Sequence, residues 1–256
     1  MNFKFIKTKL RWVPNLFTLG NLLLGFYSMI LSLRSEFNPD ILKISGILII
    51  LSVSLDGLDG FMARILDAKS ELGAQLDSLA DLITFGIAPA TLFFMMFLAD
   101  FKISFFNLSI PIGMILASFF PVSVAYRLAR FNVSHSEDSF DGLPSPIGGL
   151  VIALLPLIIY ELSFEVHTFV FIILYLLISY LMVSTIRYSK IQVSLFRRFS
   201  VFRGMIFIIF FFVLIIFLYI KFGLNIAAIA LLFLIFLYII SGIISLLIYL
   251  IQIYKW

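Results

Sequence analysis

Hydrophobic residues occur in long segments that are separated by short polar or charged ones. Most of these segments reach the length of about 20 residues that an α-helix needs to cross a bilayer. The pattern therefore predicts an all-α, polytopic membrane bundle of about eight transmembrane helices. We place these helices at residues 14–33, 41–63, 75–99, 106–127, 145–162, 167–186, 204–221 and 224–252.

The segment before the first predicted helix is amphipathic. Residues 2–13 alternate hydrophobic residues with lysines. Such a pattern is typical of a short helix that lies in the headgroup region, and equally of a basic tail that only sets topology. The first hydrophobic segment is long enough to stay in the membrane rather than to be cleaved as a signal peptide. Without any soluble domain or long linker, residues 1–256 are predicted to form one membrane domain.

Composition excludes several classes of protein. The chain is 62% hydrophobic and only 12% charged, with a mean hydropathy of +1.16, so it is not a soluble enzyme. It contains no cysteine, which excludes disulfides, thiolate metal sites and a cysteine nucleophile. Any metal chemistry is therefore expected to use oxygen ligands.

Basic residues are distributed unevenly between the two sides of the predicted bundle. With the N-terminus in the cytoplasm, 14 of the 18 Lys and Arg residues fall on the cytoplasmic side. The positive-inside rule then places both termini in the cytoplasm and predicts a multi-pass protein of the inner, cytoplasmic membrane. Topology accounts for these charges, so we expect no nucleic-acid partner.

Four aspartates interrupt the hydrophobic sequence around the second and third predicted helices. Asp56 and Asp59 are three residues apart near the end of one helix, so they share a face. Asp77 and Asp81 are four residues apart near the start of the next helix and also share a face. Because the connection is short, the two helices are expected to be antiparallel neighbours. The four carboxylates are therefore predicted to meet in one pocket at the cytoplasmic end.

These carboxylates need compensation inside a membrane. A lipid-facing Asp at the bilayer centre costs about 3 kcal/mol, so all four are expected to face inward. Arg64 alone cannot neutralise them, whereas one or two divalent cations can. Oxygen ligands favour Mg²⁺ or Mn²⁺, with Ca²⁺ as a further option. A pair of such cations suits displacement at a diphosphate, and Gly60 and Gly73 would let a nucleotide approach the backbone.

The whole pattern resembles the signature of the CDP-alcohol phosphotransferase family, integral membrane enzymes of phospholipid synthesis. The matching residues are Asp56, Asp59, Gly60, Ala63, Arg64, Gly73, Asp77 and Asp81, at the family's spacing. The resemblance implies that Asp56, Asp59, Asp77 and Asp81 ligate metal and that Asp81 is also the general base. It implies that Gly60, Ala63, Arg64 and Gly73 hold the cytidine diphosphate. It also implies a homodimer with a six-helix core, to which residues 204–252 add two helices.

Flanking segments suggest the acceptor alcohol. Residues 14–21, 75–90, 127–132 and 142–146 resemble the integral-membrane phosphatidylserine synthases of that family. This resemblance implies CDP-diacylglycerol and L-serine as substrates, among membrane lipids. Other acceptors of the family, such as glycerol phosphate or inositol phosphate, are the alternative. A cation or proton transporter that uses intramembrane aspartates is a second alternative.

Polar residues outside the signature complete the predicted site. On the predicted fourth helix, Arg127 and Arg130 are three residues apart and can pair with the carboxylate of serine or with lipid phosphate. Asn132 can contact the acceptor as well. The residues expected to line the pocket are Asn15, Thr18, Asn21 and Ser78.

Overall fold

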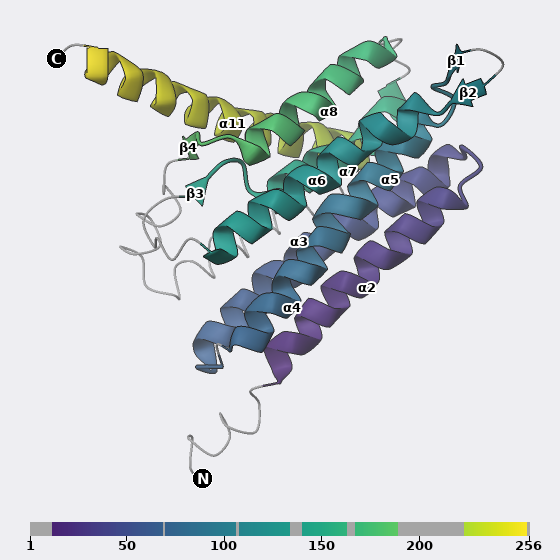
Figure 1. The fold of residues 1–256 in the computed structure, drawn as a ribbon. Coiled ribbons are helices and arrows are strands. Elements are labelled where there is room, and N and C mark those ends of the chain that lie inside the picture. The colour runs from purple at the N-terminus through teal and green to yellow at the C-terminus, as the bar shows by residue number, and fades with distance from the viewer. Residues whose placement is uncertain are drawn as a thin grey trace.

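The computed structural model describes residues 12–68, 70–105, 108–133, 140–162, 167–188 and 223–254, and these form a bundle of helices (Figure 1). The helices are α2 (Val13–Leu33), α3 (Pro39–Ile65), α4 (Glu71–Asp81), α5 (Ala88–Phe93), α6 (Ile112–Val133), α7 (Ser145–Leu162), α8 (Thr168–Val183) and α11 (Leu224–Tyr254). Two π-helical stretches, η1 (Leu82–Ile87) and η2 (Phe94–Leu98), continue the helix that α4 begins. The predicted all-α bundle is confirmed.

Two short antiparallel ribbons occur in the connections between helices. Strand β1 (Ile103–Phe105) pairs with β2 (Leu108–Ile110), and β3 (Phe140–Asp141) pairs with β4 (Arg187–Tyr188). The second ribbon fastens the segment before α7 to the segment after α8.

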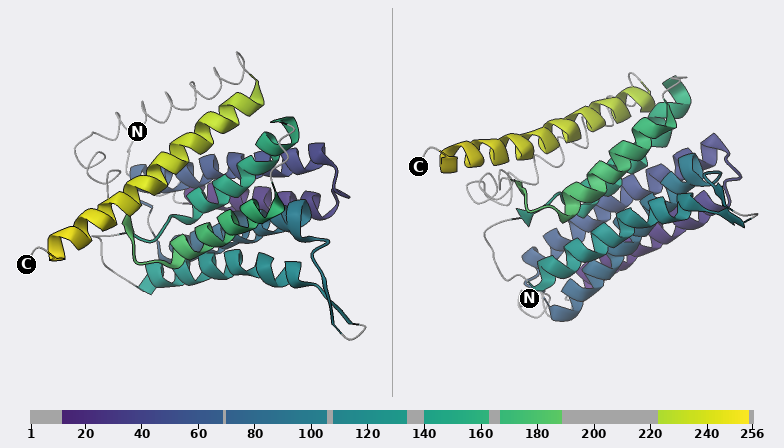
Figure 2. Two further views of the ribbon diagram at one scale, coloured as in Figure 1. Left: turned by 90° about the horizontal axis from the view of Figure 1, so that it is seen from above. Right: turned by 45° about the horizontal axis from the view of Figure 1, so that its top comes forward.

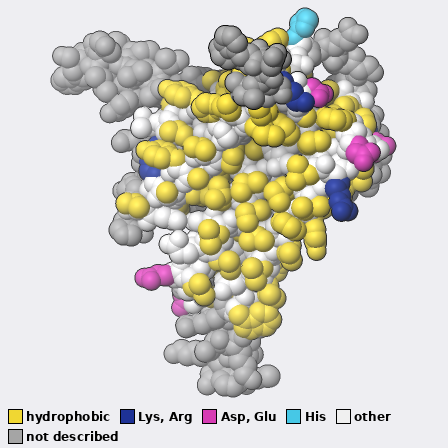
Figure 3. Space-filling model, turned by 45° about the vertical axis from the view of Figure 1, so that its right-hand side comes forward, with side chains coloured by type: hydrophobic (Ala, Val, Ile, Leu, Met, Phe, Trp, Pro, Cys, Tyr) yellow, Lys and Arg dark blue, Asp and Glu magenta, His cyan; other side chains and the backbone are white. Residues whose placement is uncertain are grey.

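Length and composition make this a multi-pass membrane protein. Among the described residues, α2, α3, the continuous helix Glu71–Leu98 and α6 are long and apolar enough to cross a membrane. The helical stretches Ser145–Tyr160, Thr168–Val183 and Ile226–Gly242 are apolar but shorter. On the face in Figure 3, hydrophobic side chains cover the middle of the molecule and charged side chains lie toward its margins.

Most predicted helices match the structure to within a few residues, but the one at 106–127 was wrong at both ends. Strand β2 occupies the predicted start, and Pro111, which has no amide hydrogen to donate, separates that strand from the helix. The helix then continues to Val133, six residues beyond the predicted end. The predictions for 2–11 and for 204–221 lie outside the described residues.

Helix α2 is the element that joins the first half of the bundle. It packs along both α3 and α4, whereas α3 and α4 scarcely contact each other directly. Helix α3 also packs against α7, and α6 packs against α8. Helix α11 lies beside α7, on one side of the bundle (Figure 2).

The hydrophobic core lies among α5, α6, α7 and α8. The ring of Tyr175 stacks on Phe93 at 4.2 Å and on Phe120 at 5.1 Å between ring centroids. All three side chains are fully buried, and the Tyr175 hydroxyl donates to the carbonyl oxygen of Ala117 at 2.6 Å. Burial of these three aromatic rings, with the Tyr175 hydroxyl hydrogen-bonded, stabilises the packing of α5, α6 and α8 against one another.

Gly46 tests how closely α3 and α7 pack. A Cβ atom at residue 46 would collide with the backbone carbonyl oxygen of Ala153 in α7. We expect Gly46→Ala to destabilise the protein by about 1–3 kcal/mol, since backbone cannot move aside cheaply. The measurement is the melting temperature of purified protein in detergent.

Gly57 in the same helix is the matched control. A Cβ atom there would meet nothing within 4 Å, so Gly57→Ala is expected to hold or raise stability by up to about 1 kcal/mol through helix propensity. Equal falls in melting temperature for the two variants would contradict the proposed α3–α7 contact.

Candidate metal centre

The turn between α3 and α4 sets the geometry of the acidic cluster. Helix α3 ends at Ile65, and Asp67 adopts a left-handed conformation with φ of 52°. Helix α4 then begins after Ser70, whose hydroxyl caps it by accepting a hydrogen bond from the Gly73 amide at 3.0 Å. The chain thus reverses direction, and the last turns of α3 lie opposite the first turns of α4.

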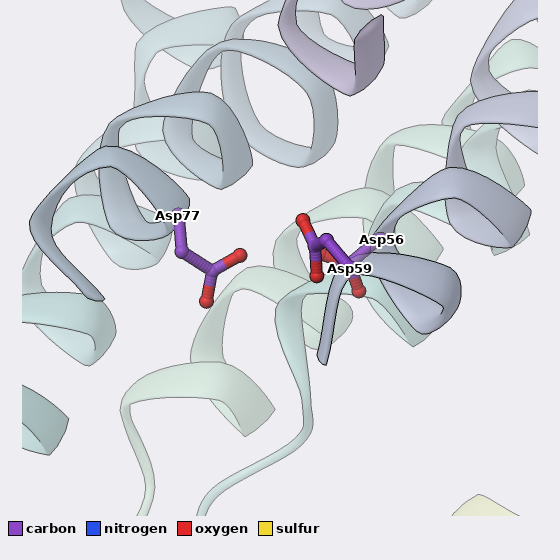
Figure 4. A group of neighbouring side chains, drawn as sticks. All are labelled: Asp56, Asp59 and Asp77. Atoms are coloured by element: carbon purple, nitrogen blue, oxygen red, sulfur yellow. The ribbon is translucent and has the colours of Figure 1, made fainter. Parts of the chain in front are cut away.

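Three of the four predicted carboxylates converge across this reversal. Asp56 and Asp59 extend from α3 toward Asp77 on α4 (Figure 4). One carboxylate oxygen from each of the three residues lies within 4.8 Å of the others. Asp59 is buried, and Asp56 and Asp77 are half-buried.

Asp81 lies one helical turn beyond Asp77 and adjoins that trio, with its carboxylate within hydrogen-bond reach of Asp56. Its side chain is 8% exposed, and its Oδ1 atom has no hydrogen-bond partner. It is within electrostatic range of Asp56, of Asp77 and of the guanidinium of Arg127. Asp81 therefore has both acidic and basic neighbours.

The donor set fits a divalent cation. Within the described part of the chain, the one ion pair joins Lys43 to Asp40. In the cluster, Asp59 accepts hydrogen bonds from neutral groups, the Thr18 hydroxyl at 2.8 Å and the backbone amide of Gly60, and Oδ1 of Asp77 has no partner. Carboxylate oxygens this close, with lone pairs to spare, are ligands suited to Mg²⁺, Mn²⁺ or Ca²⁺.

The four residues predicted to hold cytidine diphosphate lie in two different settings. A Cβ atom at Gly60 would meet nothing within 4 Å, whereas one at Gly73 would lie 3.1 Å from the Ser70 hydroxyl and 3.4 Å from Oδ1 of Asn15. Arg64 is exposed, and its Nε donates to the carbonyl oxygen of Gly60 at 3.0 Å. Ala63 is half-buried. Gly60 thus borders open space, while Gly73 lets α2 approach α4. Their nucleotide-binding role stays a prediction.

The structure separates the two arginines of α6. Arg127 is 8% exposed, donates from Nη1 to the Ser145 hydroxyl at 2.8 Å, and keeps a buried Nε atom without a partner. Arg130 instead donates to the carbonyl oxygens of Val183 at 2.8 Å and Ser184 at 3.2 Å, at the end of α8. Arg127 is thus the arginine within electrostatic range of Asp81.

The remaining predicted residues also lie near the acidic end of the bundle. Asn132 and Ser78 are hydrogen-bonded to each other between α6 and α4. Asn21 is fully buried, and neither polar atom of its side chain has a partner. Its backbone carbonyl accepts a hydrogen bond from the Thr84 hydroxyl at 3.0 Å.

Two further residues near this site were missed by the sequence analysis. Ser145 holds Arg127, and Tyr238 of α11 lies within electrostatic range of the same guanidinium. Ser145 belongs to the segment 142–146, which resembles the phosphatidylserine synthases. The distance along the chain between Ser145 and Arg127 gives no sign that the two side chains meet. No sequence signal connects Tyr238 to a residue so far away along the chain.

Comparison with known proteins adds an independent finding. The family model described as CDP-alcohol phosphatidyltransferase matches residues 11–187. A CDP-diacylglycerol–serine O-phosphatidyltransferase of Helicobacter pylori is 36% identical over 144 residues, or 55% of this chain and 55% of the relative. One of Bacillus subtilis is 31% identical over 147 residues, or 57% of this chain and 76% of the relative. One of Saccharomyces cerevisiae is 37% identical over 134 residues, covering 48% of this chain and 45% of the relative.

Asp77→Asn tests the metal centre directly. The neutral amide removes one charge from the trio, so we expect Mn²⁺ affinity to fall by at least the roughly 10–100-fold that loss of an outer-shell partner costs. The measurement is the rise in melting temperature on Mn²⁺ addition.

The exposed turn residue Asp67 supplies a matched control. Because asparagine tolerates its positive φ, Asp67→Asn is expected to keep the full rise. A wild-type Mn²⁺ response in Asp77→Asn would contradict the assignment of Asp77 as a ligand.

Proposed function

Since the chain belongs to the CDP-alcohol phosphatidyltransferase family, we propose that it transfers the phosphatidyl group of CDP-diacylglycerol to L-serine, giving phosphatidylserine and CMP. The observation that carries the proposal is the convergence of Asp56, Asp59 and Asp77 within 4.8 Å at one end of a membrane bundle. The names of the relatives support serine as the acceptor. The match covers only 55% of the Helicobacter pylori relative. The identity of the acceptor is therefore tested by the experiment below.

The cluster is proposed to hold two divalent cations, Mg²⁺ or Mn²⁺. The family is divalent-metal dependent, and the Asp cluster can bind metal. Asp56, Asp59 and Asp77 would hold the cations, with Asp81 as a further ligand. Such cations, when bound, supply positive charge that polarises phosphoryl oxygens and stabilises the leaving group.

Asp81 is proposed as the general base. Its buried, unpartnered Oδ1 atom is free to accept the proton of the serine hydroxyl. The serine oxygen then bonds to the β-phosphorus of CDP-diacylglycerol, and the bond from that phosphorus to the oxygen of CMP breaks. The proton ends on Asp81, and CMP carries away the electron pair of the broken bond. Proton removal of this kind is worth about 10²–10⁴-fold in rate.

Arg127 is proposed to hold the carboxylate of serine. Its buried Nε atom has no partner, and the guanidinium lies in electrostatic range of Asp81. A single arginine suits the single negative charge of a serine carboxylate. Glycerol phosphate carries a dianion, which asks for more basic residues, and Arg130 directs two of its donors to carbonyl oxygens of α8.

The reaction is proposed to occur at the cytoplasmic face of the cell membrane, in a homodimer. Among the described basic residues, four lie at the acidic end of the bundle and three at the other end: Arg64, Arg127, Arg130 and Arg187 against Arg34, Lys43 and Lys102. The proposed orientation rests on the positive-inside rule applied to the whole sequence, in which 14 of the 18 Lys and Arg residues fall on the predicted cytoplasmic side. The buried carboxylates among the described residues are Asp59 and Asp81, both at that acidic end, which disfavours an ion path across the membrane.

Acceptor profiling tests the proposed function. Purified protein with radiolabelled CDP-diacylglycerol and Mn²⁺ is offered serine, glycerol phosphate, inositol phosphate or water. We expect CMP release to depend on serine and labelled phosphatidylserine to form. Faster release with glycerol phosphate or inositol phosphate would assign a different acceptor within the same chemistry. Ion flux through reconstituted protein without CMP release would show that the protein is a transporter and would contradict the proposed enzymatic function.

Asp81→Asn tests the base. We expect CMP release to fall by about 10²–10⁴-fold, while the melting temperature still rises with Mn²⁺. Glu71→Gln, an exposed acid on the same helix, is the control and is expected to keep its rate. Near-normal turnover by Asp81→Asn would contradict the assignment of Asp81 as the general base.

A further inference from the structure

Helix α4 carries Asp77 and Asp81 but has few partners of its own. It packs on α2 and continues into η1, and it scarcely contacts α3, the helix that bears the opposing carboxylates. Leu72 and Leu79 of α4 are 72% and 58% exposed. The position of Asp77 relative to Asp56 and Asp59 is therefore weakly fixed by packing alone.

One side-chain contact ties α4 to α6. The amide Nδ2 of Asn132 donates to the Ser78 hydroxyl at 3.0 Å. That hydroxyl in turn lies 3.1 Å from the carbonyl oxygen of Ala74, to which it donates within α4. Helix α4 also reaches α3 through Asp81, whose carboxylate lies within hydrogen-bond reach of Asp56, but that contact joins two acidic groups. The Ser78–Asn132 bond is a neutral link between α4 and another helix. Ser78 stands directly after Asp77 and three residues before Asp81.

We propose that Asn132 and Ser78 are positioning residues, whose hydrogen bond holds α4 so that Asp77 stays close enough to Asp56 and Asp59 to share a cation. The proposal rests on the proposed metal-dependent function of the cluster. It gives Asn132 a task different from contact with the acceptor alcohol.

Electrostatics explains why such a link is needed. Asp56, Asp59 and Asp77 bear like charges and have oxygens within 4.8 Å of one another, so they repel and push α3 and α4 apart. Helix α2 packs against both helices. The Ser78–Asn132 bond additionally anchors α4 to α6, and so resists displacement of Asp77 before a cation arrives.

The first test measures metal binding without turnover. Full-length protein in detergent is titrated with Mn²⁺, and free Mn²⁺ is followed by electron paramagnetic resonance. We expect Ser78→Ala and Asn132→Ala each to raise the Mn²⁺ dissociation constant about fivefold to tenfold, as loss of one net hydrogen bond implies. The double variant is expected to be no weaker than either single one, because both remove the same bond.

Two variants act as controls. Ser78→Thr keeps a hydroxyl and is expected to keep near wild-type affinity. Ser118→Ala removes a hydroxyl of α6 that donates only to the Ile115 carbonyl within its own helix, so its affinity is expected to be unchanged. Single-variant effects that multiply in the double variant would overturn the proposal, as would wild-type affinity in Asn132→Ala.

Kinetics separates positioning from acceptor contact. We expect the Mn²⁺ concentration for half-maximal rate to rise in Asn132→Ala, while the KM for serine at saturating Mn²⁺ stays within about twofold. A tenfold rise in the KM for serine at unchanged Mn²⁺ affinity would overturn the proposal and make Asn132 an acceptor contact. Wild-type protein that binds Mn²⁺ but releases no CMP with any alcohol would refute the proposed function alone, and the titration would still decide the role of Ser78 and Asn132.

Discussion

Mutual repulsion between carboxylates inside a membrane bundle is the constraint on which this structure depends. Oxygens of Asp56, Asp59 and Asp77 lie within 4.8 Å of one another, where two unit charges repel by roughly 3 kcal/mol at an effective dielectric constant of about 20. Helices that bear such a group do not associate through it, so other elements must hold them. Helix α2 does so by packing along both α3 and α4. The charges themselves become favourable only with a cation between them, which makes the acidic end of the bundle a candidate metal centre.

The framework around this group is held by neutral polar contacts. Thr18 donates to Asp59 at 2.8 Å, Ser28 donates to the Ser45 carbonyl at 2.9 Å, and Thr84 donates to the Asn21 carbonyl at 3.0 Å. Each bond joins two different helical elements, and each satisfies a buried group that lipid could not. Hydroxyls therefore stabilise the interior without adding charge. Charge is concentrated instead where Arg127 lies within electrostatic range of Asp81.

Much of this arrangement follows from the sequence because it depends on local periodicity. Segment length predicted the membrane helices, and spacings of three and four residues predicted the faces that carry Asp56, Asp59 and Asp77. The family inferred from the signature is confirmed by the match over residues 11–187. Contacts between distant residues could not be predicted in this way. Nothing in the spacing of Asn132 or Arg127 says that one amide meets Ser78 or that one guanidinium meets Ser145. The start of α6 was misjudged because an apolar strand and an apolar helix end look alike without pairing information.

The π-helical stretch η1 begins directly after Asp81. It separates α4, which carries the carboxylates, from α5, which carries Phe93 of the aromatic core. A π-turn contains one more residue than an α-turn, and one residue corresponds to about 100° of rotation about the helix axis. Residues before and after η1 therefore follow different angular phases, although they belong to one continuous helix. Asp77 and Asp81 can face the acidic cluster while Phe93 stacks on Tyr175 in the core. The extra residue thus separates the angular phase of the carboxylates from the angular phase of the core side chains within one continuous helix.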